Sequence, residues 1–308
     1  MPVYSIFGLN IESDIQLPAI TSEGTDIQIT IRQQAIDNQL FNNELIKSSQ
    51  PSNNNPYIPV SYQQNNELWF CVENIASFYV GYGNLILYQP EEGAEQQDIL
   101  LYLLGTCLGI IMHQRGSLVL HANAIQVEDG CIIFMGKSGQ GKSTLAAGFL
   151  QAGCSILTDD LTVINHNMQV EPAIPQLKLW DDSIKRLGIK QENGKRINLH
   201  QTKFNFSLST GFCKQALPIR AIYELNVHQE NTFKFERIFG MKKFIPLRCH
   251  TYRKFYLAGL GLTKQHLKLC ANLAAQVNIT RLSRPAKPFM LNEMIQAIKQ
   301  DLAQQFVA

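Results

Sequence analysis

The sequence has 308 residues, of which 45% are hydrophobic, so it is long enough to form one large core or two ordinary ones. Its 27 Lys and Arg residues nearly balance 25 Asp and Glu residues, and the resulting formal net charge is +2. These values predict a soluble globular protein and argue against a large nucleic-acid-binding surface, although they leave local basic patches open.

The amino terminus and the cysteines indicate the cellular compartment. Residues 1–7 lack the basic region, apolar stretch and small-residue cleavage site of a secretion signal. The seven cysteines contain no Cys-x-x-Cys pair, and most stand among apolar neighbours, as small buried residues do. We therefore expect a cytoplasmic protein.

Short β-type runs separated by polar turns fill the first third of the chain, at Asp26–Ile31, Leu68–Val72 and Ala76–Val80. They predict a β-rich N-terminal module. Between them, Asn38–Asn55 is crowded with Asn, Ser and Gln, which is typical of an exposed loop, and the alternative is a docking segment for a partner or substrate.

The most apolar segment of the chain is Ile99–Met112. It is shorter than the roughly 20 apolar residues that cross a bilayer, so we expect a buried helix and no membrane partner. Gln114-Arg115-Gly116 then supplies a helix stop. This pattern predicts two domains, an N-terminal module over residues 1–114 and a second domain over residues 115–308.

Two strands are expected at the start of the second domain, at Ser117–His121 and Ala124–Val127. His121 places an imidazole in an otherwise apolar run. A lone histidine in such a run is more often a satisfied core residue than a catalytic group, so this residue alone leaves both interpretations open.

The residues that follow the apolar run Cys131–Met135 read Gly-Lys-Ser-Gly-Gln-Gly-Lys-Ser, a full match to the phosphate-binding loop pattern. A helix over Ser143–Ala152 would place this loop at a helix start, where unpaired backbone N–H groups and the positive helix end favour phosphate oxygens. A chance glycine-rich turn is the alternative, but strand, loop and helix all agree with the motif. We expect the loop to bind ATP through Gly136, Ser138, Gly139, Gln140, Gly141, Lys142, Ser143 and Thr144, with the Ser143 hydroxyl holding Mg²⁺.

An aspartate pair, Asp159-Asp160, follows the short strand expected at Cys154–Leu157. Ligand-binding groups collect at the carboxyl ends of strands in α/β sheets. Such a pair can hold Mg²⁺ and accept a proton from an attacking hydroxyl, and the alternative is that it caps a turn.

The C-terminal third adds basic side chains and two helical patterns. Among Lys178, Arg248, Arg253, Arg281 and Arg284, we select Arg248 and Arg253 as candidate phosphate contacts, although most basic residues form a solvated face. Trp180 could stack on a base or a peptide, or pack in the core. Thr263–Gln276 and Leu291–Phe306 show helical spacing, which predicts a helical C-terminal region packed against the sheet.

Taken together, Ser117–Ile164 resembles the HPr serine kinase/phosphorylase family, whose nucleotide core is related to phosphoenolpyruvate carboxykinase. The resemblance rests on the histidine-bearing strand, the phosphate loop, the helix and the aspartate pair. It implies an α/β fold with a mixed-sheet core that carries the phosphate loop. It also implies that Asp160 is the catalytic carboxylate, Lys142 the phosphate-binding lysine, Ser143 a magnesium ligand and His121 an active-site histidine, with Asp159 supporting the metal.

One departure from the family is the absence of the Glu-Ile-Arg-Gly type segment of its HPr-directed members. Leu177–Asp182 reads Leu-Lys-Leu-Trp-Asp-Asp instead. Together with the opening Tyr4–Asp14, this looks more like the divergent HPr-kinase-like proteins encoded beside peptide-modification genes, including lasso-peptide precursor kinases. That branch implies a peptide serine as acceptor and no reverse phosphorylase activity.

Three functions follow from this reading. The first is an ATP-dependent serine kinase acting on a peptide or protein, the second is a kinase for a small metabolite such as an amino acid or sugar, and the third is a non-catalytic nucleotide-binding regulator. The sequence leaves open the acceptor, the choice between ATP and GTP, and whether the chain forms a homo-oligomer.

Overall fold

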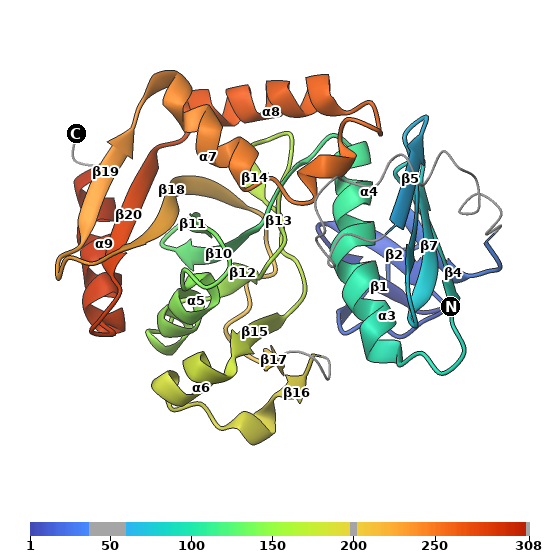
Figure 1. The fold of residues 1–308 in the computed structure, drawn as a ribbon, viewed down its shortest axis with the longest axis horizontal. Coiled ribbons are helices and arrows are strands. Elements are labelled where there is room, and N and C mark those ends of the chain that lie inside the picture. The colour runs from blue at the N-terminus through green and yellow to red at the C-terminus, as the bar shows by residue number, and fades with distance from the viewer. Residues whose placement is uncertain (37–59, 198–201, 306–308) are drawn as a thin grey trace. The chain divides into compact units, whose positions relative to one another are not determined.

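The computed structural model describes residues 1–36, 60–197 and 202–305, and the chain divides into two compact units (Figure 1). The first unit comprises Met1–Ser117 and Arg253–Leu267, and the second comprises Leu118–Tyr252 and Lys268–Ala308. The sequence-based division at residue 115 assigns residues 253–267 to the second domain, whereas in the structure they group with the first unit. The loop predicted at Asn38–Asn55 lies outside the described residues.

The first unit is built on an eight-stranded sheet with the order β3-β1-β2-β4-β8-β7-β6-β5. The β-type runs predicted in this part of the chain all contribute to it, and β7 is buried along its whole length. The strands are β1 Val3–Ile6, β2 Leu9–Ser13, β3 Ile20–Thr21, β4 Ile29–Gln33, β5 Val60–Gln64, β6 Glu67–Val72, β7 Ala76–Gly81 and β8 Leu85–Pro90.

The apolar segment predicted to be a buried helix forms a helical stretch in three parts, α3 (Gln96–Tyr102), the π-helical η1 (Leu103–Cys107) and α4 (Leu108–Gln114). All of α4 up to His113 is buried. The short helix η4 (Lys254–Tyr256) also belongs to this unit. Across the described ranges of the chain, no helix combines the length and the apolar character needed to span a bilayer.

The second unit contains a nine-stranded mixed sheet with the path β12-β10-β11-β18-β14-β13-β9, to which β20 adds beside β18 and β19 beside β20. The central strands β11, β18 and β20 run parallel, and β10 runs antiparallel to both β11 and β12. The carboxyl ends of β11 and β12 therefore lie at the same edge of the sheet. The strands are β9 Leu118–Leu120, β10 Ala122–Val127, β11 Gly130–Met135, β12 Ile156–Thr158, β13 Thr162–Ile164, β14 Gln169–Val170, β18 Leu217–His228, β19 Lys234–Ile238 and β20 Ile279–Pro285.

A small three-stranded sheet, ordered β15-β17-β16, also belongs to the second unit. Its strands are β15 Gln176–Trp180, β16 Lys195–Arg196 and β17 Lys203–Ser207. The helices of the second unit, including α8, which it shares with the first unit, are α5 Lys142–Gln151, α6 Asp181–Leu187, η2 Gln191–Asn193, η3 Gly240–Lys243, α7 Phe244–Cys249, α8 Thr263–Gln276 and α9 Leu291–Gln305. The division between the units falls within α8, at Leu267.

Helices cover both faces of the nine-stranded sheet (Figure 1). On one face, α5 and α9 pack against the sheet through residues such as Phe149 and Ile298, and α6 packs against α5 and β15 through Ile184. On the other face, α7 and α8 contribute Leu247 and Leu273. Phe149 is fully buried, and burying such a side chain stabilises a fold by about 1.5–3 kcal/mol. The sheet that carries the segments at the strand ends therefore has a hydrophobic core on each face.

The C-terminal region contains both predicted helices, as α8 and α9, but it is not only helical. The strand β20 lies between them and pairs with β18 over seven residues. Its sequence, Ile-Thr-Arg-Leu-Ser-Arg-Pro, alternates poorly between apolar and polar residues, because both of its faces are largely covered. The helical spacing of the segments on either side was the clearer pattern, so this strand was not predicted from the sequence.

Candidate active site

The phosphate-binding motif forms a loop between β11 and α5 in the second unit. Gly139 and Gly141 have φ angles of +82° and +102°, in the left-handed region where a side chain is strained. A Cβ atom on Gly136 would lie 3.1 Å from the Leu225 carbonyl oxygen on the neighbouring strand β18. Glycine at these positions therefore lets the loop turn tightly and approach β18 closely.

The Lys142 side chain folds along the inside of this loop. Its ammonium Nζ donates to the Gly136 carbonyl at 2.7 Å and to the Lys137 carbonyl at 3.4 Å, and the residue is 6% exposed. Burial lowers the pKa of Lys142, and the carboxylate of Asp160 partly offsets this effect. An ammonium has three donors, so the two carbonyls leave Lys142 able to bind a further acceptor beside the loop.

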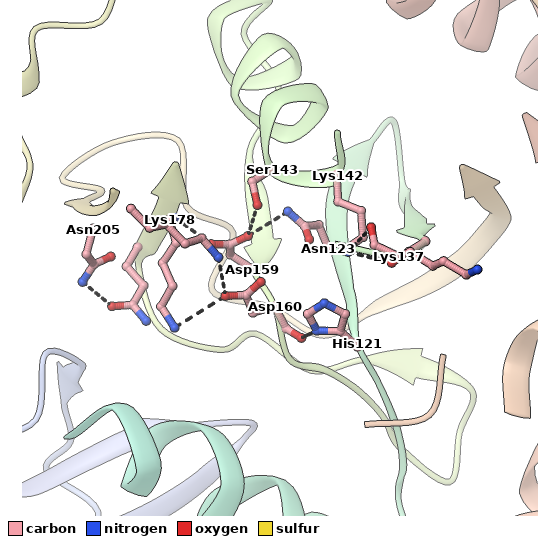
Figure 2. Close-up of polar contacts among 12 residues, drawn as sticks. His121, Asn123, Lys137, Lys142, Ser143, Asp159, Asp160, Lys178 and Asn205 are labelled. Atoms are coloured by element: carbon pink, nitrogen blue, oxygen red, sulfur yellow. Dashed lines mark hydrogen bonds and ion pairs between the residues drawn. The ribbon is translucent and has the colours of Figure 1, made fainter. Parts of the chain in front are cut away.

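Asp159 lies directly after β12 and is held by three donors from three different segments (Figure 2). Its Oδ1 accepts from Asn123 Nδ2 at 2.8 Å and from Ser143 Oγ at 3.2 Å, and its Oδ2 accepts from the Lys178 backbone N–H at 2.6 Å. Burial, followed by the negative charge of Asp160, raises the pKa of Asp159 to about 6. The helix start of α5 and the end of β12 thus meet at this carboxylate.

Asp160 presents its carboxylate to two lysines. Its Oδ2 lies 3.3 Å from Lys203 Nζ and 3.6 Å from Lys178 Nζ. The strands β15 and β17 pair with each other, and this pairing brings the two lysines to the same carboxylate. Burial would raise the pKa of Asp160, but the positive charges around it, first Lys203 and then Lys178, lower the pKa below its usual range. We call Asn123, Ser143, Asp159, Asp160, Lys178 and Lys203 the carboxylate cluster.

The backbone at Asp160 is strained. Its φ angle is +68°, and the Leu161 N–H donates to the Asp159 carbonyl at 2.9 Å across it. A hydrogen bond over two residues with a positive central φ describes a γ-turn of the rare, strained kind. Strain of this type, of order 1–3 kcal/mol, is found preferentially at functional sites and requires support from the surrounding contacts. The lysines and Asp159 provide those contacts here.

His121 lies in the break between β9 and β10, beside the carboxylate cluster (Figure 2). Its backbone N–H donates to the His250 carbonyl at 2.7 Å, and its ring Nδ1 lies 3.1 Å from the Asp160 carbonyl. A carbonyl oxygen only accepts, so Nδ1 carries the proton and Nε2 of the neutral ring keeps a lone pair. Burial, followed by the charge of Lys142, lowers the pKa of His121 to about 4.

The structure therefore brings together His121, Lys142, Ser143, Asp159 and Asp160, from three separate segments of the second unit. The two selected arginines belong to other elements of the chain. Arg248 is on α7, which packs on the opposite face of the sheet from α5, and Arg253 belongs to the first unit. Instead, Arg284 at the end of β20 reaches the loop, where its Nε donates to the Gln140 carbonyl at 3.2 Å.

Two residues that the sequence did not single out join the site. Asn123 is fully buried and orients Asp159, and Lys203 pairs with Asp160. Asn123 had a visible signal in the sequence, because it lies in an apolar run two residues after His121, and a buried amide is unusual in such a strand. Lys203 had none, since it is brought into place only by the pairing of β15 with β17.

The oxygen ligands around Ser143 fit a magnesium ion. Mg²⁺ prefers hydroxyl and carboxylate oxygens and is commonly held by one or two carboxylates together with substrate phosphates. Ser143 Oγ and Asp159 Oδ1 are 3.2 Å apart, and within the described part of the chain Asn123 Oδ1 is buried without a hydrogen-bond partner beside them. No group of three or more His, Cys, Asp or Glu side chains suited to a metal occurs among the described residues, so the phosphates would have to complete the coordination.

Comparison with known proteins adds little to this geometry. No protein-family model and no curated protein matches the chain. Among solved structures, it is similar to the HPr(Ser) kinase/phosphatase from Coxiella burnetii, with 11% sequence identity and a TM-score of 0.29, over 62% of this chain and 99% of that chain. A similarity of this extent does not establish a family, so the function has to be inferred from the site itself.

Proposed function

We propose that this protein is a kinase that transfers the γ-phosphoryl group of ATP to a hydroxyl, with a serine of a peptide or protein as the acceptor. The observation that carries the proposal is the hydrogen bond between Ser143 in the phosphate loop and Asp159, because it joins a triphosphate-binding element to a pair of adjacent carboxylates. A phosphate loop alone would support nucleotide binding, whereas the adjoining Asp160 adds a group suited to an acceptor hydroxyl.

The phosphates would be bound by the backbone N–H groups of Ser138–Ser143 and by the start of α5, where the helix dipole favours negative charge. Lys142 would add its ammonium, which already lies along the loop. Phosphoryl transfer requires mostly positioning and charge neutralisation, and these fixed donors need no rearrangement of the backbone to provide both.

Ser143 and Asp159 would hold Mg²⁺, which would neutralise negative charge that develops on the phosphates during transfer. In the protein, Asn123 and the Lys178 backbone N–H fix the Asp159 carboxylate in one orientation. The raised pKa of Asp159 reflects the burial of a negative charge, so a cation at this position would stabilise the ionised form.

Asp160 would orient the acceptor hydroxyl and take its proton. Because the lysines lower its pKa, Asp160 is ionised near neutral pH. It is therefore better suited to accept a hydrogen bond from the hydroxyl than to act as a strong base. That property suits a loose transition state, in which little proton transfer is needed before the phosphoryl group moves. Lys178 and Lys203, whose ammonium groups both lie beside the Asp160 carboxylate, would bind the transferred phosphoryl group.

The nature of the acceptor rests on the resemblance of Tyr4–Asp14 and Leu177–Asp182 to the divergent HPr-kinase-like proteins, which favours the serine of a ribosomally made precursor peptide such as that of a lasso peptide. A kinase for a small amino acid or sugar would use the same groups and differ only in its acceptor. A non-catalytic regulator would retain the loop, but would have no use for the strained, lysine-paired Asp160.

The proposal is tested by incubating the protein with ATP, Mg²⁺ and a panel of acceptors, and by measuring the mass of each. The panel contains serine-bearing peptides, including any small peptide found to be encoded beside the gene, the same peptides with every serine changed to alanine, free serine and common sugars. A gain of one phosphate on the serine peptide alone supports the proposal, whereas a gain on a small molecule alone assigns the second function. ATP binding without transfer to any acceptor would overturn the kinase assignment.

A further inference from the structure

A pocket of about 370 Å³ opens beside the phosphate loop in the second unit. The loop contributes Gly141 and Thr144 to its lining, and more distant segments contribute Trp180, Arg186, Arg284 and Phe289. We call these six residues the aromatic pocket. Its volume falls within the range of about 300–1,000 Å³ that is typical of small-molecule sites.

The aromatic pocket presents flat apolar surfaces to solvent. Trp180 is 38% exposed and Phe289 is 43% exposed, although large aromatic side chains are usually buried. The Arg186 guanidinium lies 5.2 Å from the centre of the Phe289 ring, and the Lys203 ammonium lies 5.8 Å from that of Trp180. Aromatic rings and a planar guanidinium are the groups on which nucleobases stack.

The charges around the pocket favour an anion at its loop end. Arg284 Nε binds the Gln140 carbonyl, and a Cβ placed on Gly141 would lie 3.5 Å from Arg284 Nη2, so this guanidinium sits against the loop. Arg186 is near enough for its charge to add to the burial that lowers the pKa of Arg284. Asp182 is the acidic residue in the lining, and it is exposed.

The helix start of α5 connects the pocket to the carboxylate cluster. Ser143 contacts Asp159, whereas the next residue, Thr144, lines the pocket and bonds Ser183 Oγ at 2.8 Å. Successive helical residues point in directions about 100° apart, so two neighbouring side chains face two different regions. A phosphate chain on the loop would therefore have the carboxylates at one end and the aromatic pocket at the other.

We propose that the aromatic pocket binds the purine base and ribose of the nucleotide, with the base stacked on Phe289 and Trp180 and with Arg284 on the phosphates nearest the ribose. This inference rests on the proposed function, since it assigns a nucleoside site to the triphosphate that the loop would bind. A two-ring base covers more of the exposed aromatic surface than a one-ring base, so purine nucleotides bind more tightly than pyrimidine nucleotides.

The test compares ATP with inorganic tripolyphosphate, which carries the phosphates but no base. Trp69 and Trp180 are the only tryptophans in the sequence, so the substitution Trp69→Phe leaves Trp180 as the sole tryptophan reporter in the pocket. We expect ATP to change the Trp180 fluorescence and tripolyphosphate to leave it nearly unchanged. Dissociation constants from calorimetry are then measured for both ligands.

Phe289→Ala is the decisive variant and Phe239→Ala its control. Phe239 is 72% exposed and is not part of the pocket lining. We expect Phe289→Ala to raise the Kd for ATP about tenfold and leave the Kd for tripolyphosphate unchanged, because stacking is lost while the loop stays intact. Arg186→Met should act in the same direction, and an unchanged Tm shows that each variant is folded.

The outcomes separate the two proposals. If Phe289→Ala leaves the Kd for ATP unchanged or weakens both ligands equally, the pocket does not bind the base, while the kinase proposal stands. If the variant weakens ATP alone but the wild type transfers phosphate to no acceptor, the base site stands and the kinase proposal fails. If a serine peptide binds and abolishes the change in Trp180 fluorescence that ATP causes, the pocket binds the acceptor and the inference is overturned.

Discussion

The phosphate loop adjoins two regions that are built very differently. In the carboxylate cluster, Asn123 and Asp159 are buried and the other residues are half-buried, and each acidic group is held by several donors from separate segments. The aromatic pocket is open, and its rings and guanidiniums make few contacts with one another. A reacting centre needs fixed groups, whereas a binding surface needs accessible area, so the difference separates chemistry from recognition on the two sides of one loop. Changes in the cluster should therefore affect rate and stability, and changes in the pocket should affect affinity.

The largest effect is expected for Asp160→Asn. We expect the rate of phosphoryl transfer to fall by about 10²–10⁴-fold, because a positioned proton acceptor is lost, while the Kd for ATP stays within about twofold of wild type. Single-turnover transfer and calorimetric binding measure the two quantities. Asp129→Asn, at an exposed carboxylate outside the site, is the matched control. Wild-type transfer by the Asp160 variant would remove this residue from the reaction.

His121 should make the stability of the protein depend on pH. Its pKa of about 4 lies below the usual 6.5, so between pH 6.5 and 4 the unfolded chain takes up a proton that the folded chain excludes. His121 therefore leaves the free energy of unfolding unchanged above pH 6.5 and lowers it by about 3 kcal/mol as the pH falls to 4. Asp159, whose raised pKa acts in the opposite direction, titrates in the same pH range, and the charges of Asp160, Lys142 and Lys203 act on the pKa of His121.

The His121 contribution is isolated by subtracting the pH profile of His121→Gln from that of wild type, both from urea denaturation. A difference that is flat between pH 4 and 6.5 would show that the imidazole is not held neutral by burial. A pocket variant such as Phe289→Ala should leave the profile unchanged.

Lys142→Met should weaken the binding of both ATP and tripolyphosphate to the loop. Hydrogen bonds to charged groups contribute about 1.5–3 kcal/mol, so we expect the Kd for ATP and for tripolyphosphate to rise by about 10- to 100-fold each. This parallel loss contrasts with the selective loss expected for Phe289→Ala. If Lys142→Met weakens ATP alone, the loop and the pocket do not divide phosphate from base as described.

Asn123→Ala should lower the free energy of unfolding by about 1–3 kcal/mol, because it removes a donor from a buried carboxylate. Phe289→Ala should change it by less than about 0.5 kcal/mol, as expected for a partly exposed side chain away from the core. Urea denaturation of the two variants at pH 7 provides a direct measure of how unlike the two regions are. Equal losses would contradict the division into a rigid and an open side.

The sequence predicted those parts of the site that are continuous in the chain. The loop, the strand before it, the helix after it and Asp159-Asp160 all follow local rules of glycine placement, apolar runs and helix starts, and the structure contains β11, α5 and β12 close to the expected ranges. Their roles in binding and transfer remain predictions.

The remainder depends on contacts between distant segments. Arg284 reaches the loop only because β20 is inserted beside β18, and local pattern gave no reason to prefer it over Arg248 or Arg253. The aromatic pocket likewise combines Trp180, Arg186 and Phe289 from three segments, so no single stretch of sequence could reveal it.

The strained turn at Asp160 determines which replacement is informative. Asparagine tolerates a positive φ better than most residues and has nearly the same shape as aspartate, so Asp160→Asn preserves the turn, whereas Asp160→Ala would change the backbone as well as the charge. An inactive protein with an undisturbed backbone can retain nucleotide and acceptor together without consuming either. Immobilised on a resin in the presence of ATP, it would serve as bait for recovering the natural acceptor from cell extract.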